Sequence, residues 1–491
     1  MTEELKGNRS QPAMVEMSDT TTKRFFLRTY GCQMNVHDSE RMAGLMAHEG
    51  FALTDDPTQA DVIVINTCSV REKPEQKLFS ELGAYRKLKE QNPHLIIGVA
   101  GCMAPREADT IRARAPFVDI LLGPRSIARL PELVHKVELQ RKPIDAIDLL
   151  DDPTPLTPVR RASTLSAWVD VIFGCDYKCT FCAVPSARGR ERSRPPQDIF
   201  AEIDELVALG YKEVTLLGQT VNAYGRDWGY RLPNGQGSEL RVLVDRSDGG
   251  IIPLTTQAAR RETQERIDFA WLLAQIDRRA PHLRVRFTSP HPQLFTDRLI
   301  RAIADLPTVC EHVHLPLQSG HNEVLRRMKR TYTIEKFRAI VEKLRDAVPG
   351  IAITTDLIAG FPGETEEQHQ ATLKLLEEIQ FDQAFMFAYS PRRHTPAAAF
   401  PDQVPPDVKQ RRLAEIIALQ NEIARQKNAA LVGQTFEVLV EGPSEKDPTK
   451  LSGRTRHNKT MVFEGSEDLI GQLVPVRATK GFLWGFEGVM E

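Results

Sequence analysis

The sequence predicts an α/β protein of three domains: an open α/β sheet domain, a partial (β/α)6 barrel, and a small C-terminal β-barrel. Short apolar runs alternate with helical patterns near the start of the chain and again, with six candidate strands, in its middle. The end of the chain alternates polar and apolar residues and is interrupted by glycine. A length of 491 residues suits about three domains of roughly 150 residues each.

One pattern that occurs three times between residues 23 and 140 predicts the first sheet. The runs FFLRTYGC, DVIVINTC and LIIGVAGC end at Cys32, Cys68 and Cys102. A helical pattern follows each run, and we expect the first of these helices to have Asp38 as its N-cap. Ligands in open α/β sheets bind beyond the carboxyl ends of the strands, so we expect the three cysteines to converge on one point.

A second alternating series predicts the barrel in residues 161–404. Its candidate strands are WVDVIF, EVTLLG, RVRFTS, HVHLPLQ, IAITTDLIAG and QAFMFAYS. Six βα units predict an incomplete barrel that is open on one side. Residues 1–22 are expected to form a disordered leader, and residues 141–160, rich in proline and aspartate, a linker. An insertion near 226–266 is polar and glycine-rich, and we assign it no role.

A helical pattern from Pro405 to about Leu431 leads to the last domain. We place the linking helix at residues 405–423 and the final domain at residues 424–491. The segments QTFEVLVEG, LSGRTRHNKTMVFEG and LVPVRATKGFLWGFEG predict the strands of a small β-barrel, a fold that often binds RNA.

Composition restricts the class of protein. The chain has 64 basic and 66 acidic residues, so any RNA-binding surface must be local. We find no apolar run long enough for a transmembrane helix, which takes about 20 residues, and no export signal at the N-terminus. We therefore expect a cytoplasmic protein without a membrane partner. In a reducing compartment its seven cysteines favour metal ligands or free thiols over disulfides.

The strongest chemical signal is the segment VIFGCDYKCTFCAVP, which contains Cys175, Cys179 and Cys182. A closed zinc site has four ligands, and no fourth cysteine or histidine follows nearby. Three thiolates on a four-iron cluster leave one iron open to a reactant. A zinc site with a distant fourth ligand, or idle thiols, is the alternative.

The N-terminal cysteines are interpreted in the same way, as ligands of a second open cluster. Their alternative is that of small buried hydrophobic residues. We interpret Cys310 as a packed thiol without a role.

The CxxxCxxC spacing, with the aromatic Phe181 before its last cysteine, resembles the radical S-adenosylmethionine signature. From about Lys23 onward, the domain order resembles that of the radical S-adenosylmethionine methylthiotransferase family, whose C-terminal domain is a TRAM domain. The resemblance implies two 4Fe-4S clusters and S-adenosylmethionine as cofactors. It places one cluster on the barrel cysteines, where the cofactor is cleaved to a radical, and the second on the N-terminal cysteines, where a sulfur species is methylated.

Within this family, TYGCQMNVHDSE, NTCSVREKPEQK, LLGQTVNAYG and HLPLQSG are most similar to members that modify isopentenylated tRNA. The resemblance implies methylthiolation of C2 of N6-isopentenyladenosine next to the anticodon, with S-adenosylmethionine as methyl donor and as radical source. Other members act on threonylcarbamoyl-adenosine tRNA or on a ribosomal-protein aspartate, and these stay as alternatives. A non-catalytic iron–sulfur sensor that binds RNA is a third. Because an unactivated aromatic C–H has no useful acidity, we expect no catalytic histidine or glutamate.

The remaining predictions concern the cofactor and RNA contacts. For the cofactor contacts, an ordinary turn after a barrel strand is an equal alternative. The expected cofactor-binding residues are Phe181, Gly218, Gln219, Gln318, Ser319, Gly360 and Gly363. Clustered cations predict RNA-binding residues after the cysteine loop and in the last domain: Arg188, Arg190, Arg192, Arg194, Arg454, Arg456 and Lys459. We expect His37 and His457 at the surface or in turns. The expected partners are tRNA and a flavodoxin- or ferredoxin-type electron donor; the sulfur donor is open, and we expect a monomer.

Overall fold

The structure is a computed structural model that describes residues 22–68, 72–149, 158–228, 243–245, 251–253 and 267–491. The expected leader lies outside the described residues, apart from Thr22. Most of the insertion near 226–266 also lies outside them. Its described strands β11 (Leu243–Asp245) and β12 (Ile251–Pro253) pair antiparallel. Within the described part of the chain, no helix is both long and apolar enough to cross a membrane.

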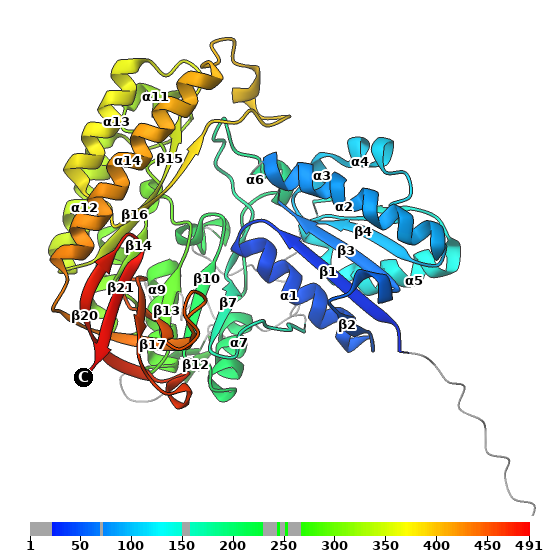
Figure 1. Cartoon of the computed structure of the whole chain (residues 1–491), viewed down its shortest axis with the longest axis horizontal. Coiled ribbons are helices and arrows are strands. Elements are labelled where there is room, and N and C mark those ends of the chain that lie inside the picture. Colours follow the sequence, from blue (N-terminus) through cyan, green and yellow to red (C-terminus); the bar gives the residue numbers. More distant parts are fainter. Residues whose placement is uncertain (1–21, 69–71, 150–157, 229–242, 246–250, 254–266) are drawn as a thin grey trace, which may run out of the picture.

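The N-terminal domain is a parallel sheet with helices on both faces (Figure 1). Residues of β3 point alternately to the two faces: Ile63 and Ile65 pack with the cluster around Leu78, whereas Val62 and Val64 pack with the cluster around Met42. The strands, in sheet order, are β2 (Ala52–Thr54), β1 (Arg24–Tyr30), β3 (Val62–Thr67), β4 (Ile96–Ala100), β5 (Ile120–Leu122) and β6 (Ile144–Ala146). The helices are α1 (Gln33–His48), α2 (Glu72–Gln91), α3 (Met103–Arg106), α4 (Ala108–Arg114) and α5 (Leu130–Gln140).

Two boundary predictions in this domain are wrong. Helix α1 begins directly after Cys32, which is its N-cap. Asp38 does not cap the helix: it lies within α1, faces inward, and its carboxylate accepts a hydrogen bond from Arg188. The expected linker at residues 141–160 contains β6. The Ile144 N–H donates to the Asp119 carbonyl at 2.7 Å, so this short segment completes the sheet despite its flanking prolines and aspartates.

The middle domain is the expected partial barrel of parallel strands. The strands are β7 (Ser166–Asp170), β10 (Glu213–Leu217), β13 (Arg284–Phe287), β14 (His312–His314), β15 (Ala352–Ala359) and β16 (Gln383–Ala388). A parallel bridge between Val285 and Val309 connects its two halves. The covering helices are α7 (Pro196–Ala208), α9 (Phe269–Arg279), α10 (Asp297–Asp305), α11 (Asn322–Arg327), α12 (Ile334–Ala347) and α13 (Glu366–Ile379). The barrel is open between β7 and β16, where the N-terminal domain lies beside β7 (Figure 1).

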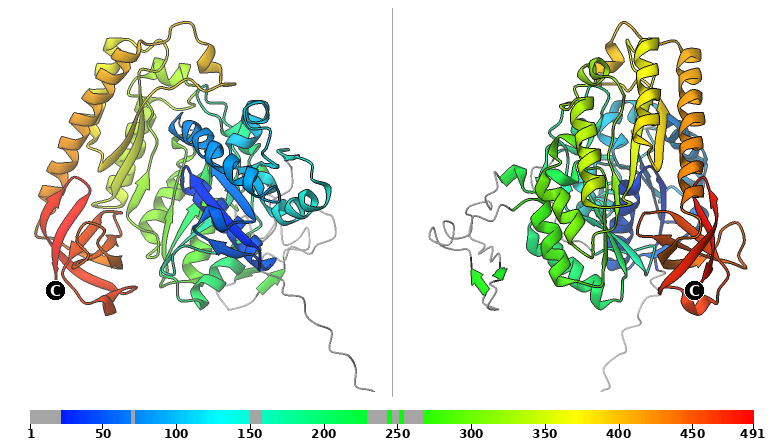
Figure 2. Two further views of the ribbon diagram at one scale, coloured as in Figure 1. Left: turned by 45° about the vertical axis from the view of Figure 1, so that its right-hand side comes forward. Right: turned by 90° about the vertical axis from the view of Figure 1, so that its left-hand side faces the viewer.

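Helix α14 (Pro406–Ala430) runs along α13 and β16 to the last domain (Figure 2). It continues past residue 423, the expected end of the linking helix, because no glycine or proline interrupts it before Gly433. The last domain is a closed barrel, as expected. Its strands, in order, are β17 (Thr435–Pro443), β18 (Leu451–Thr455), β19 (Thr460–Phe463), β21 (Gly485–Met490) and β20 (Leu473–Phe482).

The last domain is held against the amino ends of the barrel strands by arginines of β13. Arg284 donates to the Arg454 carbonyl at 2.9 Å, and Arg286 donates to the Thr455 carbonyl at 2.7 Å. Both guanidinium groups are buried and also pair with carboxylates, Arg284 with Glu437 and Arg286 with Glu213. A buried cation needs such partners, so this end of the barrel is closed by a specific contact.

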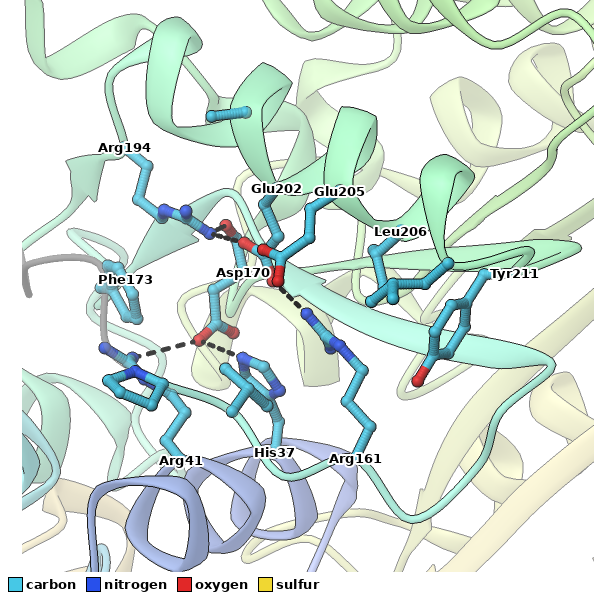
Figure 3. A pocket seen from close by; sticks show the side chains of 14 residues that line it. His37, Arg41, Arg161, Asp170, Phe173, Arg194, Glu202, Glu205, Leu206 and Tyr211 are labelled. Atoms are coloured by element: carbon cyan, nitrogen blue, oxygen red, sulfur yellow. Dashed lines mark hydrogen bonds and ion pairs between the residues drawn. The ribbon is translucent and has the colours of Figure 1, made fainter. Parts of the chain in front are cut away.

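The N-terminal domain is held against β7 by a buried charge network (Figure 3). His37 of α1 lies with Nε2 3.1 Å from the Asp170 carboxylate, and Arg41 lies 3.6 Å from the same group. Burial alone lowers the pKa of His37, but the Asp170 carboxylate raises it to about 9. Burial raises the pKa of Asp170, and His37 with Arg41 lowers it to about 2. The expectation that His37 lies at the surface is therefore wrong.

Candidate functional site

The barrel cysteines lie on a loop between two short strands, β8 (Ile172–Phe173) and β9 (Arg192–Ser193), next to helix α6 (Val184–Arg188). Gly174 opens the loop with φ +71°, and a side chain there would collide with the Arg190 carbonyl. The Cys175 N–H donates to the Gly189 carbonyl at 3.1 Å, and the Thr180 N–H donates to the Met328 carbonyl at 3.0 Å. The backbone thus holds this loop at the carboxyl ends of the barrel strands.

Each sulfur of this loop has a polar neighbour. Arg330 Nη1 donates to Cys179 Sγ at 3.3 Å, and the Val184 N–H donates to Cys182 Sγ at 3.4 Å. Cys175 Sγ lies 3.2 Å from the Thr220 hydroxyl. Hydrogen bonds to sulfur are a usual means of tuning iron–sulfur centres.

Burial raises the pKa of two of these thiols, Cys175 to about 11 and Cys182 to about 12. A coordinating metal deprotonates a thiol outright, so loading a metal centre at these cysteines would release protons. Among the described residues, one set of His, Cys, Asp and Glu side chains has its ligand atoms all within 4.8 Å of one another, and it is not made of cysteines.

That compact set, Glu366, His369 and Glu415, does not suit a metal ion. Arg411 pairs with both carboxylates at 2.7 Å, and Arg412 lies 3.2 Å from Glu366. Guanidinium groups thus already satisfy the acidic oxygens.

The N-terminal cysteines converge as the strand pattern predicted. Cys32 follows β1, Cys68 follows β3 and Cys102 follows β4, and these strands are neighbours in the sheet. The Cys68 N–H donates to the Tyr30 carbonyl at 2.9 Å, and a hydrogen bond with Cys68 lowers the pKa of the Cys32 thiol to about 6. A Cβ on Gly31 would lie 2.7 Å from the Cys68 Cβ, so only glycine permits this approach.

Arg188 connects this second site to the barrel. It is buried, its Nε donates to Cys102 Sγ at 3.2 Å, and its Nη2 donates to the Asp38 carboxylate at 2.6 Å. The prediction that Arg188 contacts RNA is therefore wrong, because its side chain is consumed by contacts inside the protein.

Two further RNA-contact predictions are wrong for the same reason. Arg194 is buried against Glu202 at 2.8 Å. Lys459 is buried and lies 3.0 Å from Asp382. The other predicted contacts stay predictions, because these side chains are not buried: Arg190 (3.2 Å from Asp176), Arg192, Arg454 (3.4 Å from Glu441) and Arg456 (2.7 Å from Glu311).

Gln219 is the best placed of the expected cofactor contacts. Its Oε1 accepts a hydrogen bond from the Gly174 N–H, while its Nε2 is buried and has no hydrogen-bond partner among the described residues. In the same part of the chain, His291 Nε2 is a second buried nitrogen without such a partner, and its ring is stacked 3.9 Å from Tyr177 of the cysteine loop. Buried polar atoms are normally paired, so these two suit hydrogen bonds to a ligand.

The other expected cofactor contacts stay predictions. Phe181 is half-buried, 6.5 Å from Phe361, and Gln318 and Ser319 are buried beyond the end of β14, where Gln318 has φ +71°. Three glycines have packing reasons that need no cofactor: a Cβ would meet Ile172 at Gly218, Lys409 at Gly360, and the Arg327–Asp402 ion pair at Gly363. Cys310 is buried, in agreement with a packed thiol.

The sequence analysis missed the lining of the barrel bore. His314 lies 3.3 Å from Asp356, and the Phe385 ring is 5.7 Å from the His314 ring and 45% exposed. The strand registers place Asp356 opposite Phe385 on the same face. Polar and aromatic residues stand at alternate positions of β14, β15 and β16. Because alternate residues of a strand face the same side, this two-residue period could have predicted the lining of the barrel from the sequence.

A cavity of about 380 Å³ lies beside the network of Figure 3. Its charged residues pair with one another, for example Arg161 and Arg194 with Glu202. We assign it no ligand.

Comparison with known proteins agrees with this architecture. Residues 24–123 match the uncharacterized protein family UPF0004, residues 169–376 match the radical SAM superfamily, and residues 429–482 match the TRAM domain. Among solved structures, the radical S-adenosylmethionine methyltransferase TsrM from Kitasatospora setae superposes with a TM-score of 0.50 at 14% identity, covering 77% of this chain and 75% of that one. The fold and the cysteine loop define a radical S-adenosylmethionine enzyme, and this class implies a 4Fe-4S cluster and S-adenosylmethionine.

Curated relatives define the family more narrowly. The tRNA-2-methylthio-N(6)-dimethylallyladenosine synthase of Carboxydothermus hydrogenoformans is 43% identical over 95% of this chain and 99% of the relative. The protein of the same name from Moorella thermoacetica is 45% identical over 95% of this chain and 98% of the relative. The chain belongs to the family of tRNA-2-methylthio-N(6)-dimethylallyladenosine synthases.

Proposed function

We propose that this enzyme methylthiolates C2 of N6-isopentenyladenosine next to the anticodon of tRNA, with S-adenosylmethionine as methyl donor and as radical source. The observation that carries the proposal is the pairing of two three-cysteine sites in one chain, one at the mouth of the barrel and one at the neighbouring edge of the N-terminal sheet. The names of full-length relatives supply the substrate.

In this proposal Cys175, Cys179 and Cys182 hold one 4Fe-4S cluster, and Cys32, Cys68 and Cys102 hold a second. With three protein ligands, each cluster would leave one iron open to a reactant, and the cluster on the barrel cysteines would supply the one-electron chemistry that generates a radical from S-adenosylmethionine.

The protein's own residues orient the reactants. The Gln219 amide N–H, which has no partner among the residues that the structure describes, suits the carboxylate of S-adenosylmethionine. It lies beside the loop because Gln219 Oε1 accepts a hydrogen bond from the Gly174 N–H. In the bore, the exposed face of Phe385 suits stacking on the adenine, next to the His314–Asp356 pair. We assign no group as acid or base, because C2–H is not acidic.

Further parts of the proposal concern partners. A flavodoxin- or ferredoxin-type protein supplies electrons, the enzyme works as a monomer in the cytoplasm, and tRNA contacts the TRAM domain.

Nucleoside mass spectrometry on a deletion strain tests the function. We expect 2-methylthio-N6-isopentenyladenosine to disappear from bulk tRNA and N6-isopentenyladenosine to accumulate. Restoring the intact gene should reverse both changes, whereas a gene with Cys179→Ala should restore neither. Normal amounts of the methylthiolated nucleoside in the deletion strain would contradict the assignment, and loss of a methylthio group from threonylcarbamoyl-adenosine instead would support the related substrate.

A further inference from the structure

One short segment of the barrel domain reaches both three-cysteine sites. Cys182 lies at its start, helix α6 follows, and Arg188 lies at its end, where Nε is 3.2 Å from Cys102 Sγ. Figure 1 shows α6 next to α3, the helix that begins directly after Cys102. The segment therefore carries a cysteine of one site and a hydrogen-bond donor to a cysteine of the other.

The contact is reciprocated from the N-terminal domain. Arg125 of that domain donates from Nε to the Arg188 carbonyl at 2.9 Å and from Nη2 to the Arg190 carbonyl at 2.7 Å. Arg188 in turn extends into the N-terminal domain, where its Nη2 donates to Asp38 at 2.6 Å. Two arginines thus cross the same interface in opposite directions, and each meets acceptors at defined positions.

Burying the charged side chain of Arg188 at this position is unfavourable unless specific contacts compensate for the lost hydration. Its side chain is only 5% exposed, and the Asp38 side chain is 2% exposed. Burying two charges carries a desolvation penalty that their attraction must offset. An apolar side chain of similar size would fill the space, but it would not donate to the Cys102 sulfur.

We propose that Arg188 is a positioning residue that holds the N-terminal cysteine site at a set place relative to the barrel loop and donates a hydrogen bond to the sulfur of Cys102 when that sulfur ligates a cluster. The proposal rests on the proposed function for the presence of that cluster. Hydrogen bonds and positive charge next to a thiolate ligand stabilise the reduced, more negative state of a cluster. Arg188 therefore raises the reduction potential of the N-terminal site.

The test measures a potential rather than tRNA modification. In a full-length Cys175→Ala, Cys179→Ala, Cys182→Ala background, anaerobic reconstitution with iron and sulfide loads only the N-terminal site. We expect Arg188→Met to shift the midpoint potential of that cluster to a more negative value in a titration followed by electron paramagnetic resonance. Arg190→Met is the matched control: the side chain lies two residues away, is 74% exposed and pairs with Asp176, so the potential should stay unchanged.

A conservative variant separates the hydrogen bond from the charge. Arg188→Lys retains one cation but loses the planar fork that reaches Cys102 and Asp38 together, so its potential should lie between those of the parent and Arg188→Met. Hydrogen exchange of α3 and α6 should be faster in both variants than in Arg190→Met, because the contact between the domains is weakened.

Each outcome decides the proposal. If Arg188→Met does not bind iron, Arg188→Lys is measured in its place. A midpoint potential of Arg188→Lys equal to that of the parent then overturns the proposal. A parental potential together with parental hydrogen exchange in Arg188→Met also overturns it. A cluster-free N-terminal site in the Arg188-containing background would instead refute the second cluster of the proposed function. A deletion strain with normal nucleosides would refute the substrate while leaving this measurement intact.

Discussion

The two three-cysteine sites are built in opposite ways. Cys175, Cys179 and Cys182 lie on one short loop, whereas Cys32, Cys68 and Cys102 come from the ends of three neighbouring strands. The three cysteines of the first site come with one loop, which the Met328 carbonyl and Arg330 also hold. The second exists only when β1, β3 and β4 pair in register, and it reaches the first through the domain interface. We therefore expect the barrel site to tolerate damage elsewhere, and the N-terminal site to depend on the whole sheet.

The largest expected effect comes from the local site. Cys179→Ala removes a proposed cluster ligand and the acceptor of the Arg330 hydrogen bond. We therefore expect complete loss of 5′-deoxyadenosine release from S-adenosylmethionine under reductant, and with it loss of methylthiolation. Cys310→Ala is the control, since Cys310 is buried away from both sites, and it should retain cleavage. Substantial cleavage by Cys179→Ala would show that this cysteine is not a ligand.

The next largest effect separates the two sites. Cys68→Ala should leave release of 5′-deoxyadenosine within about a factor of two but abolish methylthiolation, because only the N-terminal site is lost. Chromatography of the nucleosides and of 5′-deoxyadenosine from one reaction measures both quantities. Full methylthiolation by this variant would contradict a role for the N-terminal cysteines in the reaction.

A smaller effect is expected from the interface next to the N-terminal site. Asp170→Asn leaves the buried His37 and Arg41 without their carboxylate, and losing one partner of a buried pair typically costs about 3–5 kcal/mol. We expect a lower midpoint of thermal unfolding, with the N-terminal domain affected first. The matched control is Asp204→Asn in the exposed pair with Arg279, for which about 0–1 kcal/mol is expected. Equal destabilisation by the two variants would contradict the interface argument.

The smallest effect is the dependence of this interface on pH. The pKa of His37 is raised from 6.5 to about 9, so its contribution is complete below pH 6.5 and is lost as the pH rises through 9. The pKa of Asp170 is lowered from 3.8 to about 2, so its contribution is complete above pH 3.8 and is lost as the pH falls through 2. Stability should therefore decline between pH 6.5 and 9. His37→Gln should flatten that decline, and an unchanged slope would assign it to other groups.

The sequence predicted what depends on local pattern. Strand positions such as 213–217 and 383–388, the barrel of parallel strands and the convergence of Cys32, Cys68 and Cys102 all follow from apolar periodicity and from the geometry of parallel sheets. The roles of the arginines could not be predicted in this way, because a run such as SARGRERSR shows charge but does not show which side chains are buried. Arg188 and Arg194 point into the protein because acceptors distant in the chain, Asp38 and Glu202, lie there.

Local sequence patterns also failed to predict β6 and the start of α1. A three-residue strand between prolines has no periodicity to detect, and Asp38 has the composition of a helix cap whether or not it caps. Long-range pairing decided both.

The contact between β13 and the C-terminal domain sets the two ends of the barrel apart. Arg284 and Arg286 donate to carbonyl groups of the TRAM domain at the amino ends of the strands, whereas the cysteine loop lies at their carboxyl ends. Under the proposed function the adenine reaches the cysteine loop from that second end. A base in a stacked duplex is not exposed for such chemistry, so the adenine would have to leave its stack first.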